Sequence, residues 1–226
     1  MTVEHIKQTI GDYCAAATLA MQIGFDGVEI HGGNGYLPEQ FLSSNVNKRH
    51  DAYGGTPEKR CRFILELMAA VASAIGEHNV SIRLSPFGLF NQARGEQRLE
   101  TWTCLCEGLK SSFPSLSYRF DRTCGFEEKD RVLESWGLLD VTLGHFRKIF
   151  GSTPFFSAGG WDDLNSWGVV ESGKYDAVLY GRYFTSNPDL VRRLKEKIPM
   201  APYDRTRFYG PFEDRAFHYT DYPTAA

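Results

Sequence analysis

Three polar side chains follow a short apolar stretch near the start of the chain, and together they could bind a carbonyl group and move a proton. Residues 27–31 have the length and character of a buried strand, and His31, Asn34 and Tyr36 stand at its end or just past it. Imidazole and amide N–H groups can donate hydrogen bonds to a carbonyl oxygen. A tyrosine hydroxyl, with a reference pKa of about 10, can give a proton to an enolate. The spacing therefore indicates carbonyl activation.

Other candidate site residues also fall at the ends of expected strands. Arg83 lies in an apolar segment, where a guanidinium group is costly unless an anion or a carboxylate faces it. Two later strands are followed by Gly159 and Gly160 and by Gly181 and Arg182. Structural roles stay open, because a single histidine after a strand is more often structural and a glycine pair permits a tight turn whatever it binds.

The elements that must position these residues alternate between helix and strand. Apolar residues at helical spacing, glycine stops and a proline at a first turn predict helices, and short apolar runs predict the strands between them. The expected helices are residues 4–21, 57–75, 99–109, 138–150, 162–171 and 188–197, and the expected strands are 27–31, 80–84, 116–120, 154–157 and 176–180. This alternation favours parallel strands in an α/β fold.

About five strands are fewer than the eight that close a β/α barrel, so the expected fold is an incomplete β/α barrel of the TIM type with flanking helices. We expect residues 1–198 to form the partial barrel domain. Residues 199–226 are expected to form an irregular aromatic tail packed on the same domain. Functional groups of such barrels gather where the strands end, which is where the candidate residues fall.

Composition argues against several classes of function. A net charge of −3 and the lack of a basic tract argue against nucleic acid as a partner. No apolar run reaches the roughly 18 residues that span a bilayer, and the first residues lack the pattern of a signal peptide. The five cysteines include no Cys-x-x-Cys pair, so neither a disulfide framework nor a zinc site is indicated. We expect a soluble, cytoplasmic protein without a metal or a membrane partner.

The motifs of the chain, taken in order, resemble the C-terminal part of the old yellow enzyme family, the FMN-dependent ene-reductases built on a (β/α)8 barrel. The resemblance covers nearly the whole chain, and only residues 92–134 are hard to align. The matching motifs are His31-x-x-Asn34-x-Tyr36, Gln40-Phe41-Leu42, Asn47-x-Arg49-x-Asp51-x-Tyr53-Gly54-Gly55, Arg60-x-Arg62-Phe63, Arg83-Leu84-Ser85-Pro86, Ala158-Gly159-Gly160 and Gly181-Arg182-x-Phe184-x-Ser186-Asn187-Pro188-Asp189-Leu190.

The resemblance implies roles for the matched residues. In the family, the counterparts of His31 and Asn34 bind the carbonyl oxygen of an unsaturated substrate, and that of Tyr36 delivers a proton to the α-carbon. The counterpart of Arg83 lies against the flavin ring near N1 and O2. The positions whose counterparts hold the FMN phosphate are Gly159, Gly160, Gly181 and Arg182.

The same resemblance leads us to expect a chain that has lost its cofactor. Family members carry three further βα units before the histidine motif, and those units bring further contacts to the flavin. Without flavin no hydride is available, so only proton chemistry remains. We therefore expect a flavin-independent epimerase or isomerase with no cofactor, acting in natural-product (secondary metabolite) biosynthesis. His31 and Asn34 would polarise a substrate carbonyl, and an α-proton would move through an enolate with the help of Tyr36.

Alternatives stay open at this point. FMN, held with the help of a second chain, would make the protein an FMN-dependent, NADPH-using ene-reductase, and a third reading is a non-catalytic partner of a full-length reductase. The base of the epimerase also stays open between neutral His31 and an unplaced carboxylate. In the catalytic cases the partner is a small-molecule carbonyl substrate. Five strands in an open sheet leave two unpaired edges, so we expect a homodimer that covers the open side.

Overall fold

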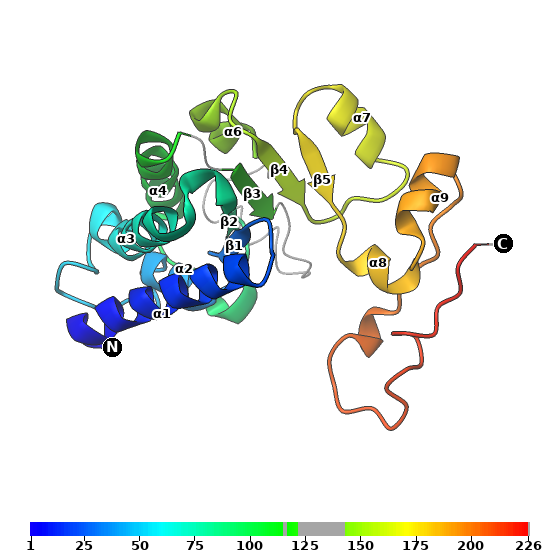
Figure 1. Ribbon diagram of the computed structural model, residues 1–226, viewed down its shortest axis with the longest axis horizontal. Helices are drawn as coiled ribbons and strands as arrows, with labels where there is room; N and C mark the ends of the chain where they lie inside the picture. Colours follow the sequence, from blue (N-terminus) through cyan, green and yellow to red (C-terminus); the bar gives the residue numbers. More distant parts are fainter. Residues whose placement is uncertain (115–116, 122–142, 226) are drawn as a thin grey trace. The chain divides into compact units, whose positions relative to one another are not determined.

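The computed structural model describes residues 1–114, 117–121 and 143–225, and the chain divides into two compact units, Met1–Ser157 and Ala158–Ala226. Helices and strands alternate along the chain (Figure 1). Five strands are present in the described residues, and β1 pairs with β2 and β2 with β3 in parallel. The expected α/β class is therefore confirmed.

The first unit builds a short parallel sheet covered by longer helices, with its strands in the order β1-β2-β3-β4. Its elements in chain order are α1 (Val3–Gln22), β1 (Val28–His31), α2 (Leu37–Leu42), α3 (Pro57–Ile75), η1 (Glu77–Asn79), β2 (Val80–Leu84), η2 (Phe90–Gln92), α4 (Arg98–Ser112), β3 (Ser117–Asp121), α6 (Gly144–Phe150) and, at the boundary of the units, β4 (Phe155–Ala158).

Strand pairing brings the end of β1 beside the end of β2. The Cα register places Val28 opposite Val80 and His31 opposite Arg83. The Gly32 N–H donates to the Arg83 carbonyl oxygen at 2.8 Å, so the ladder continues one residue past β1. Because opposed residues of neighbouring strands project to the same face of a sheet, His31 and Arg83 share one face at this edge.

Helix α3 contributes a large part of the core of the first unit. Helix α3 begins at Pro57, whose missing N–H suits the first turn, and ends at Gly76, which has φ +88°. It packs against both α1 and α4, which flank it in Figure 1. Its buried residues are Arg60, Cys61, Phe63, Ile64, Leu67, Met68 and Val71. Burial of this apolar face, rather than helix propensity, holds α3 in place.

The second unit consists of short elements and a C-terminal segment without regular structure. Its elements are α7 (Ser166–Glu171), β5 (Ala177–Leu179), α8 (Arg182–Ser186), α9 (Leu190–Glu196) and η3 (Arg205–Arg207). Asn187, which is fully buried, fixes the start of the last segment. Its Nδ2 donates to the Ala201 carbonyl oxygen at 3.0 Å, and its Oδ1 accepts from the Ala201 N–H at 2.8 Å.

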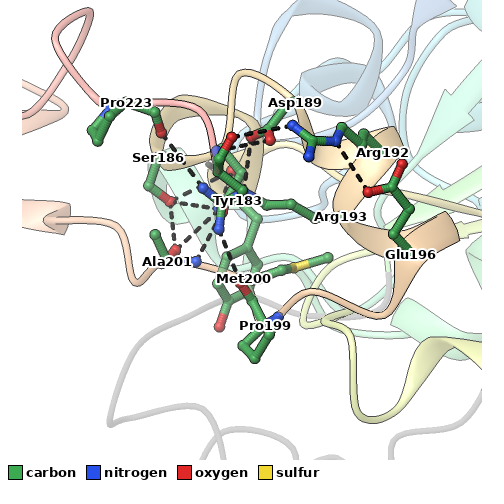
Figure 2. A network of polar contacts seen from close by, with 12 residues as sticks. Tyr183, Ser186, Asp189, Arg192, Arg193, Glu196, Pro199, Met200, Ala201 and Pro223 are labelled. Atoms are coloured by element: carbon green, nitrogen blue, oxygen red, sulfur yellow. Dashed lines mark hydrogen bonds and ion pairs between the residues drawn. The ribbon is translucent and has the colours of Figure 1, made fainter.

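A buried arginine and its ion-pair partner Asp189 fix the same segment at two further points (Figure 2). Arg193 Nε donates to Asp189 Oδ1 at 2.8 Å, and Arg193 Nη1 donates to the Pro199 carbonyl oxygen at 3.0 Å. The other carboxylate oxygen of Asp189 accepts from the Ala225 N–H at 3.0 Å. The family-like run from Ser186 to Leu190 therefore anchors residues 199–225 onto the second unit.

Some helix boundaries differ from the sequence-based expectation. Helix α7 begins at Ser166 rather than near residue 162, because Asp162 Oδ1 accepts the N–H groups of Leu164 and Asn165 and closes a turn instead. The expected helix at 138–150 is seen from Gly144, and residues 138–142 lie outside the described part.

Two kinds of feature, a membrane-spanning helix and a metal-binding cluster, are absent from the described ranges. None of the helices there has both the length and the apolar character needed to cross a membrane. Those ranges also contain no group of three or more His, Cys, Asp or Glu side chains placed to hold a metal ion.

Candidate active site

The loop after β1 carries three of the candidate residues. His31 is the last residue of β1, and Tyr36 directly precedes α2. The ring centroids of His31 and Tyr36 lie 5.5 Å apart, with the ring planes inclined by 52°. His31 and Asn34 are half-buried, whereas Tyr36 is 57% exposed. The loop therefore places an imidazole and a phenol side by side at the carboxyl edge of the sheet.

Asn34 is held in a left-handed backbone conformation by contacts on both sides. Its φ is +56°, a region that asparagine tolerates better than most residues. Its N–H donates to Ser85 Oγ at 2.7 Å, and its carbonyl oxygen accepts from Asn91 Nδ2 at 3.0 Å. The segment after β2 therefore fixes the backbone at Asn34.

Gly35 occupies a position that no other residue fits. Its φ is +71°, and a Cβ added there would lie 2.4 Å from the Phe90 carbonyl oxygen. Its N–H donates to Glu39 Oε2 at 2.7 Å. The close approach of residue 90 and the hydrogen bond to α2 together fix the turn that leads into Tyr36.

Glu39, on α2, is a buried carboxylate directly beneath the loop. Besides the Gly35 N–H, it accepts hydrogen bonds from Ser85 Oγ at 2.9 Å and from Arg98 Nη2 at 3.0 Å. Burial raises the pKa of Glu39, and the positive charge of Arg98 and these hydrogen bonds oppose that rise. A buried carboxylate is retained where donors surround it in this way.

Arg98, the first residue of α4, donates several hydrogen bonds to the loop after β2. Its guanidinium donates to the carbonyl oxygens of Pro86 at 2.5 Å, Ala93 at 2.6 Å and Gly88 at 2.8 Å. Together with its bond to Glu39, these contacts tie the loop after β2 to the loop after β1. The Arg98–Glu39 ion pair therefore fixes the backbone that carries the candidate side chains.

The sequence did not single out Glu39, Ser85 or Arg98 as residues of the site. Arg98 falls in the stretch that is hard to align by eye, and Ser85 was only part of a quoted motif. The available signal for such a support was Glu39 itself. It lies in α2 with Pro38 and Phe41, which are both buried, and a carboxylate buried with them requires a polar partner.

Another part of the family-like pattern folds the loop after α2. Asn47 Nδ2 donates to the carbonyl oxygens of Phe41 and Tyr53, each at 2.7 Å. Arg49 forms an ion pair with Asp51, whose Oδ1 also accepts the Tyr53 N–H at 3.0 Å. These motif residues therefore fix the loop that follows α2. Helix α2 in turn follows the loop that carries His31.

Arg83 joins the first group of candidates through strand register. It lies opposite His31 and is half-buried near the end of β2. A guanidinium group at this edge provides a fixed positive charge and donors for an electron-rich ring or an anion.

The remaining candidates lie in the second unit. Gly159 and Gly160 follow β4 with φ of +95° and +76°, and Gly181 and Arg182 follow β5. A Cβ at Gly181 would meet nothing within 4 Å. Tyr180 Oη lies 3.5 Å from the Asp162 carbonyl oxygen, which links the segment after β4 to the end of β5.

The Arg182 side chain is suited to an anion. It is half-buried, and its guanidinium carbon lies 5.3 Å from the centroid of the Tyr203 ring. Among the residues that the structure describes, no carboxylate forms an ion pair with it. The structure thus places His31, Asn34, Tyr36 and Arg83 together in the first unit, and the glycines and Arg182 in the second.

Comparisons with known proteins identify the family of the chain. Residues 1–201 match the model of the NADH:flavin oxidoreductase / NADH oxidase family. The chain is 43% identical to the flavin oxidoreductase hxnT of Emericella nidulans, covering 100% of the chain and 61% of that protein. It is 40% identical to 12-oxophytodienoate reductase 1 of Oryza sativa subsp. japonica, covering 99% of the chain and 57% of that protein.

Solved structures extend the likeness to the fold. The old yellow enzyme homologue from Zymomonas mobilis superposes with a TM-score of 0.81 at 30% identity, and 100% of this chain covers 61% of that one. Morphinone reductase in complex with tetrahydroNAD gives a TM-score of 0.80 at 31% identity, with 100% and 58% covered. The chain therefore spans about three-fifths of its relatives' length, and the expected partial barrel is confirmed.

These findings correct the expected chemistry. The prediction of a flavin-independent epimerase or isomerase is wrong, and so is the prediction that the protein has no cofactor. The whole chain matches flavin oxidoreductases. That expectation gave the start of the sequence more weight than the family resemblance, which covers nearly the whole chain. The earlier alternative, an FMN-dependent oxidoreductase, agrees better with the matches. The chain belongs to the NADH:flavin oxidoreductase / NADH oxidase family.

Proposed function

We propose that this chain provides the carbonyl-binding and proton-donating residues of an FMN-dependent reductase that uses NADH or NADPH to reduce α,β-unsaturated carbonyl compounds. The observation that carries the proposal is the rigid loop in which His31, Asn34 and Tyr36 follow β1 beside Arg83. The family match supports a redox reaction rather than proton transfer alone.

Each unit, taken by itself, offers groups of the kind that FMN requires. In the first unit, the half-buried Arg83 offers a positive charge to the ring. In the second unit, the open space at Gly181 and the guanidinium of Arg182 offer room and charge for a phosphate. When bound, FMN supplies the hydride that the protein side chains cannot.

The side chains of the loop would act on the carbonyl substrate. His31 and Asn34 would donate hydrogen bonds to its oxygen, where negative charge develops as the enolate forms, and each such donor contributes about 3 kcal/mol in a site that excludes water. Tyr36 would then give its hydroxyl proton to the α-carbon. Because Glu39 and Ser85 fix the loop backbone, these groups need little rearrangement during the reaction.

The decisive experiment combines a spectrum with an isotope label. The purified protein is titrated with FMN, and the complex is reduced anaerobically by NADPH and mixed with 2-cyclohexenone in D2O. We expect a yellow, stoichiometric complex and a saturated ketone that carries solvent deuterium at the α-carbon, because the Tyr36 hydroxyl exchanges with solvent. A protein that binds no FMN, or a complex that leaves the enone unreduced, would contradict the proposal.

The expected homodimer stays a prediction. In the described part of the sheet, β1 pairs only with β2, so a second copy that covers its free edge would satisfy the unpaired backbone groups. Analytical ultracentrifugation measures the oligomeric state, and a monomer at all concentrations would contradict this prediction.

A further inference from the structure

Two cysteine side chains meet where α3 packs against α4. Cys61, on α3, is fully buried, and Cys104, on α4, is half-buried. The Cys61 thiol donates a hydrogen bond to the Thr101 carbonyl oxygen of α4, with 3.3 Å between sulfur and oxygen. The same thiol interacts with the Cys104 side chain. Thr101 precedes Cys104 by about one helical turn, so both contacts lie on the face of α4 that α3 covers.

The surroundings divide the two thiols into unequal partners. The hydrogen bond from Cys61 lowers the pKa of Cys104 to about 7, although burial acts in the other direction. The same hydrogen bond and burial raise the pKa of Cys61 far above its usual value. Since the thiolate is the reactive form of cysteine, Cys104 is the nucleophile of the pair and Cys61 is a neutral thiol in contact with it.

We propose that Cys61 and Cys104 form a redox-active thiol pair, which a hydroperoxide converts into a disulfide between α3 and α4. The Cys104 thiolate attacks the peroxide, forming an S–O bond as the O–O bond breaks, and the leaving oxygen takes up a proton. The Cys61 sulfur then attacks the sulfenic acid, so that the S–S bond forms, the S–O bond breaks and water leaves with the Cys61 proton. Two thiols are oxidised by two electrons, and one peroxide is reduced.

Such a disulfide would join the two helices that hold the loop of the candidate site. From α3, Arg60 Nε donates to the Leu42 carbonyl oxygen at the end of α2, at 2.9 Å, and Arg60 Nη2 donates to Thr101 Oγ1 at 2.6 Å. From α4, Arg98 forms the ion pair with Glu39. Each helix of the thiol pair thus carries an arginine that binds α2, and oxidation of the pair would fix the two helices to one another.

Other cysteines of the described residues provide internal controls. Cys106 is fully buried, and burial raises its pKa well above the usual value. Burial also raises the pKa of Cys14 on α1. Neither thiol forms much thiolate at neutral pH, so we expect both to react slowly. Cys124 lies outside the described residues and is followed by mass spectrometry alone.

The first test uses the unaltered protein and needs no flavin. The reduced protein is treated with an equimolar amount of hydrogen peroxide, its remaining thiols are alkylated, and the digest is analysed by mass spectrometry. We expect a peptide pair joined through Cys61 and Cys104, formed within one chain and released by dithiothreitol. Links that join other cysteines instead, or sulfenic acid at Cys104 that never resolves, would overturn the proposal.

The second test separates the hydrogen bond from the disulfide. Cys61→Ser keeps a donor beside Cys104 but cannot form a link, whereas Cys61→Ala loses both. In the wild type, iodoacetamide should alkylate Cys104 with a half-maximal rate near pH 7. Cys61→Ser should keep that profile and accumulate a sulfenic acid that dimedone traps, and Cys61→Ala should move the profile toward pH 9.0, the usual thiol value.

A control keeps the second test interpretable. Cys14→Ser changes a cysteine of α1 and should alter neither the link nor the alkylation profile. If Cys61→Ala leaves the pH profile of Cys104 unchanged, the hydrogen bond does not activate the thiol and the proposal fails. If the buried substitutions prevent folding, Cys104→Ser at the half-buried position still tests the link, which it should abolish.

Discussion

Arg98 and Glu39 form an ion pair with 3.0 Å between Nη2 and Oε1, and their side chains are only 4% and 0% exposed. The two residues are far apart in the sequence, yet each also binds backbone of the loops that carry the candidate site. Glu39 accepts the Gly35 N–H, and Arg98 donates to three carbonyl oxygens between Pro86 and Ala93. The pair therefore positions the backbone of both loops from a buried location.

The first prediction concerns the loss of Arg98. Arg98→Met leaves the Glu39 carboxylate buried without its counter-charge, and breaking a buried pair from one side costs about 3 to 5 kcal/mol. We expect the free energy of unfolding, measured by urea denaturation, to fall by that amount. Arg98→Met combined with Glu39→Leu should recover part of the loss, since no unpaired charge then remains.

A surface ion pair of the same unit provides the control. Arg62 and Glu66, on α3, lie 3.8 Å apart with side chains 50% and 40% exposed. Arg62→Met should change the free energy of unfolding by no more than about 0.5 kcal/mol. Equal effects of Arg62→Met and Arg98→Met would show that the buried pair has no special role.

The second prediction concerns Gly35. Gly35→Ala places a Cβ against the Phe90 carbonyl oxygen. It also adds backbone strain, because alanine disfavours a φ of +71°. Gly24→Ala is a matched control, because Gly24 has φ +97° but nothing within 4 Å of an added Cβ. Gly24→Ala should cost about 1 to 2 kcal/mol from strain alone, and Gly35→Ala should cost more in the same urea measurement. Equal costs would mean that the contact with residue 90 relaxes freely.

Local signals explain why part of the fold was predictable. Helix α3 has the expected bounds at Pro57 and Ile75, because a proline start, a glycine stop and apolar spacing all lie within the segment itself. Residues 162–165 were expected to be helical and are not, because the carboxylate of Asp162 accepts backbone N–H groups that a helix would otherwise use. That competition depends on side-chain geometry, which apolar spacing does not report.

The candidate site was also predictable only in part. His31, Asn34 and Tyr36 were predictable from one short segment at a strand end. Their supports Ser85 and Arg98 were not, because they come from distant segments that only the fold brings near. The redox chemistry was mispredicted for another reason: the expectation relied on where the sequence begins, whereas the match to a flavin oxidoreductase covers the whole chain.

The third prediction tests the proton donor. In the FMN complex, Tyr36→Phe should lower the rate of enone reduction by about a hundredfold or more, as loss of a general acid does. The rate at which NADPH reduces the flavin should stay within about twofold, since that step needs no proton at the α-carbon. Stopped-flow measurement of the two half-reactions distinguishes these effects.

Tyr53→Phe is the matched control for the loss of a tyrosine hydroxyl. Tyr53 is buried, and its hydroxyl donates to Glu66 Oε2 at 2.7 Å, away from the loop after β1. The variant should lower stability by about 1 kcal/mol, the usual net value of one hydrogen bond, and leave both half-reactions unchanged. A Tyr36→Phe enzyme that behaves like Tyr53→Phe would remove Tyr36 from the mechanism.

The last prediction concerns acid and the C-terminal segment. The hydrogen bond from Arg193, followed by that from the Ala225 N–H, lowers the pKa of Asp189 below its usual 3.8. A depressed carboxyl pKa contributes stability that is complete above the unfolded value and is lost as the pH falls through the folded one. The difference in stability between wild type and Asp189→Asn should therefore be largest near neutral pH and vanish as the pH drops below 3.8. Glu196→Gln, which removes the exposed partner of Arg192, should show little difference at any pH, and a constant gap for Asp189→Asn would mean that its charge does not hold the segment.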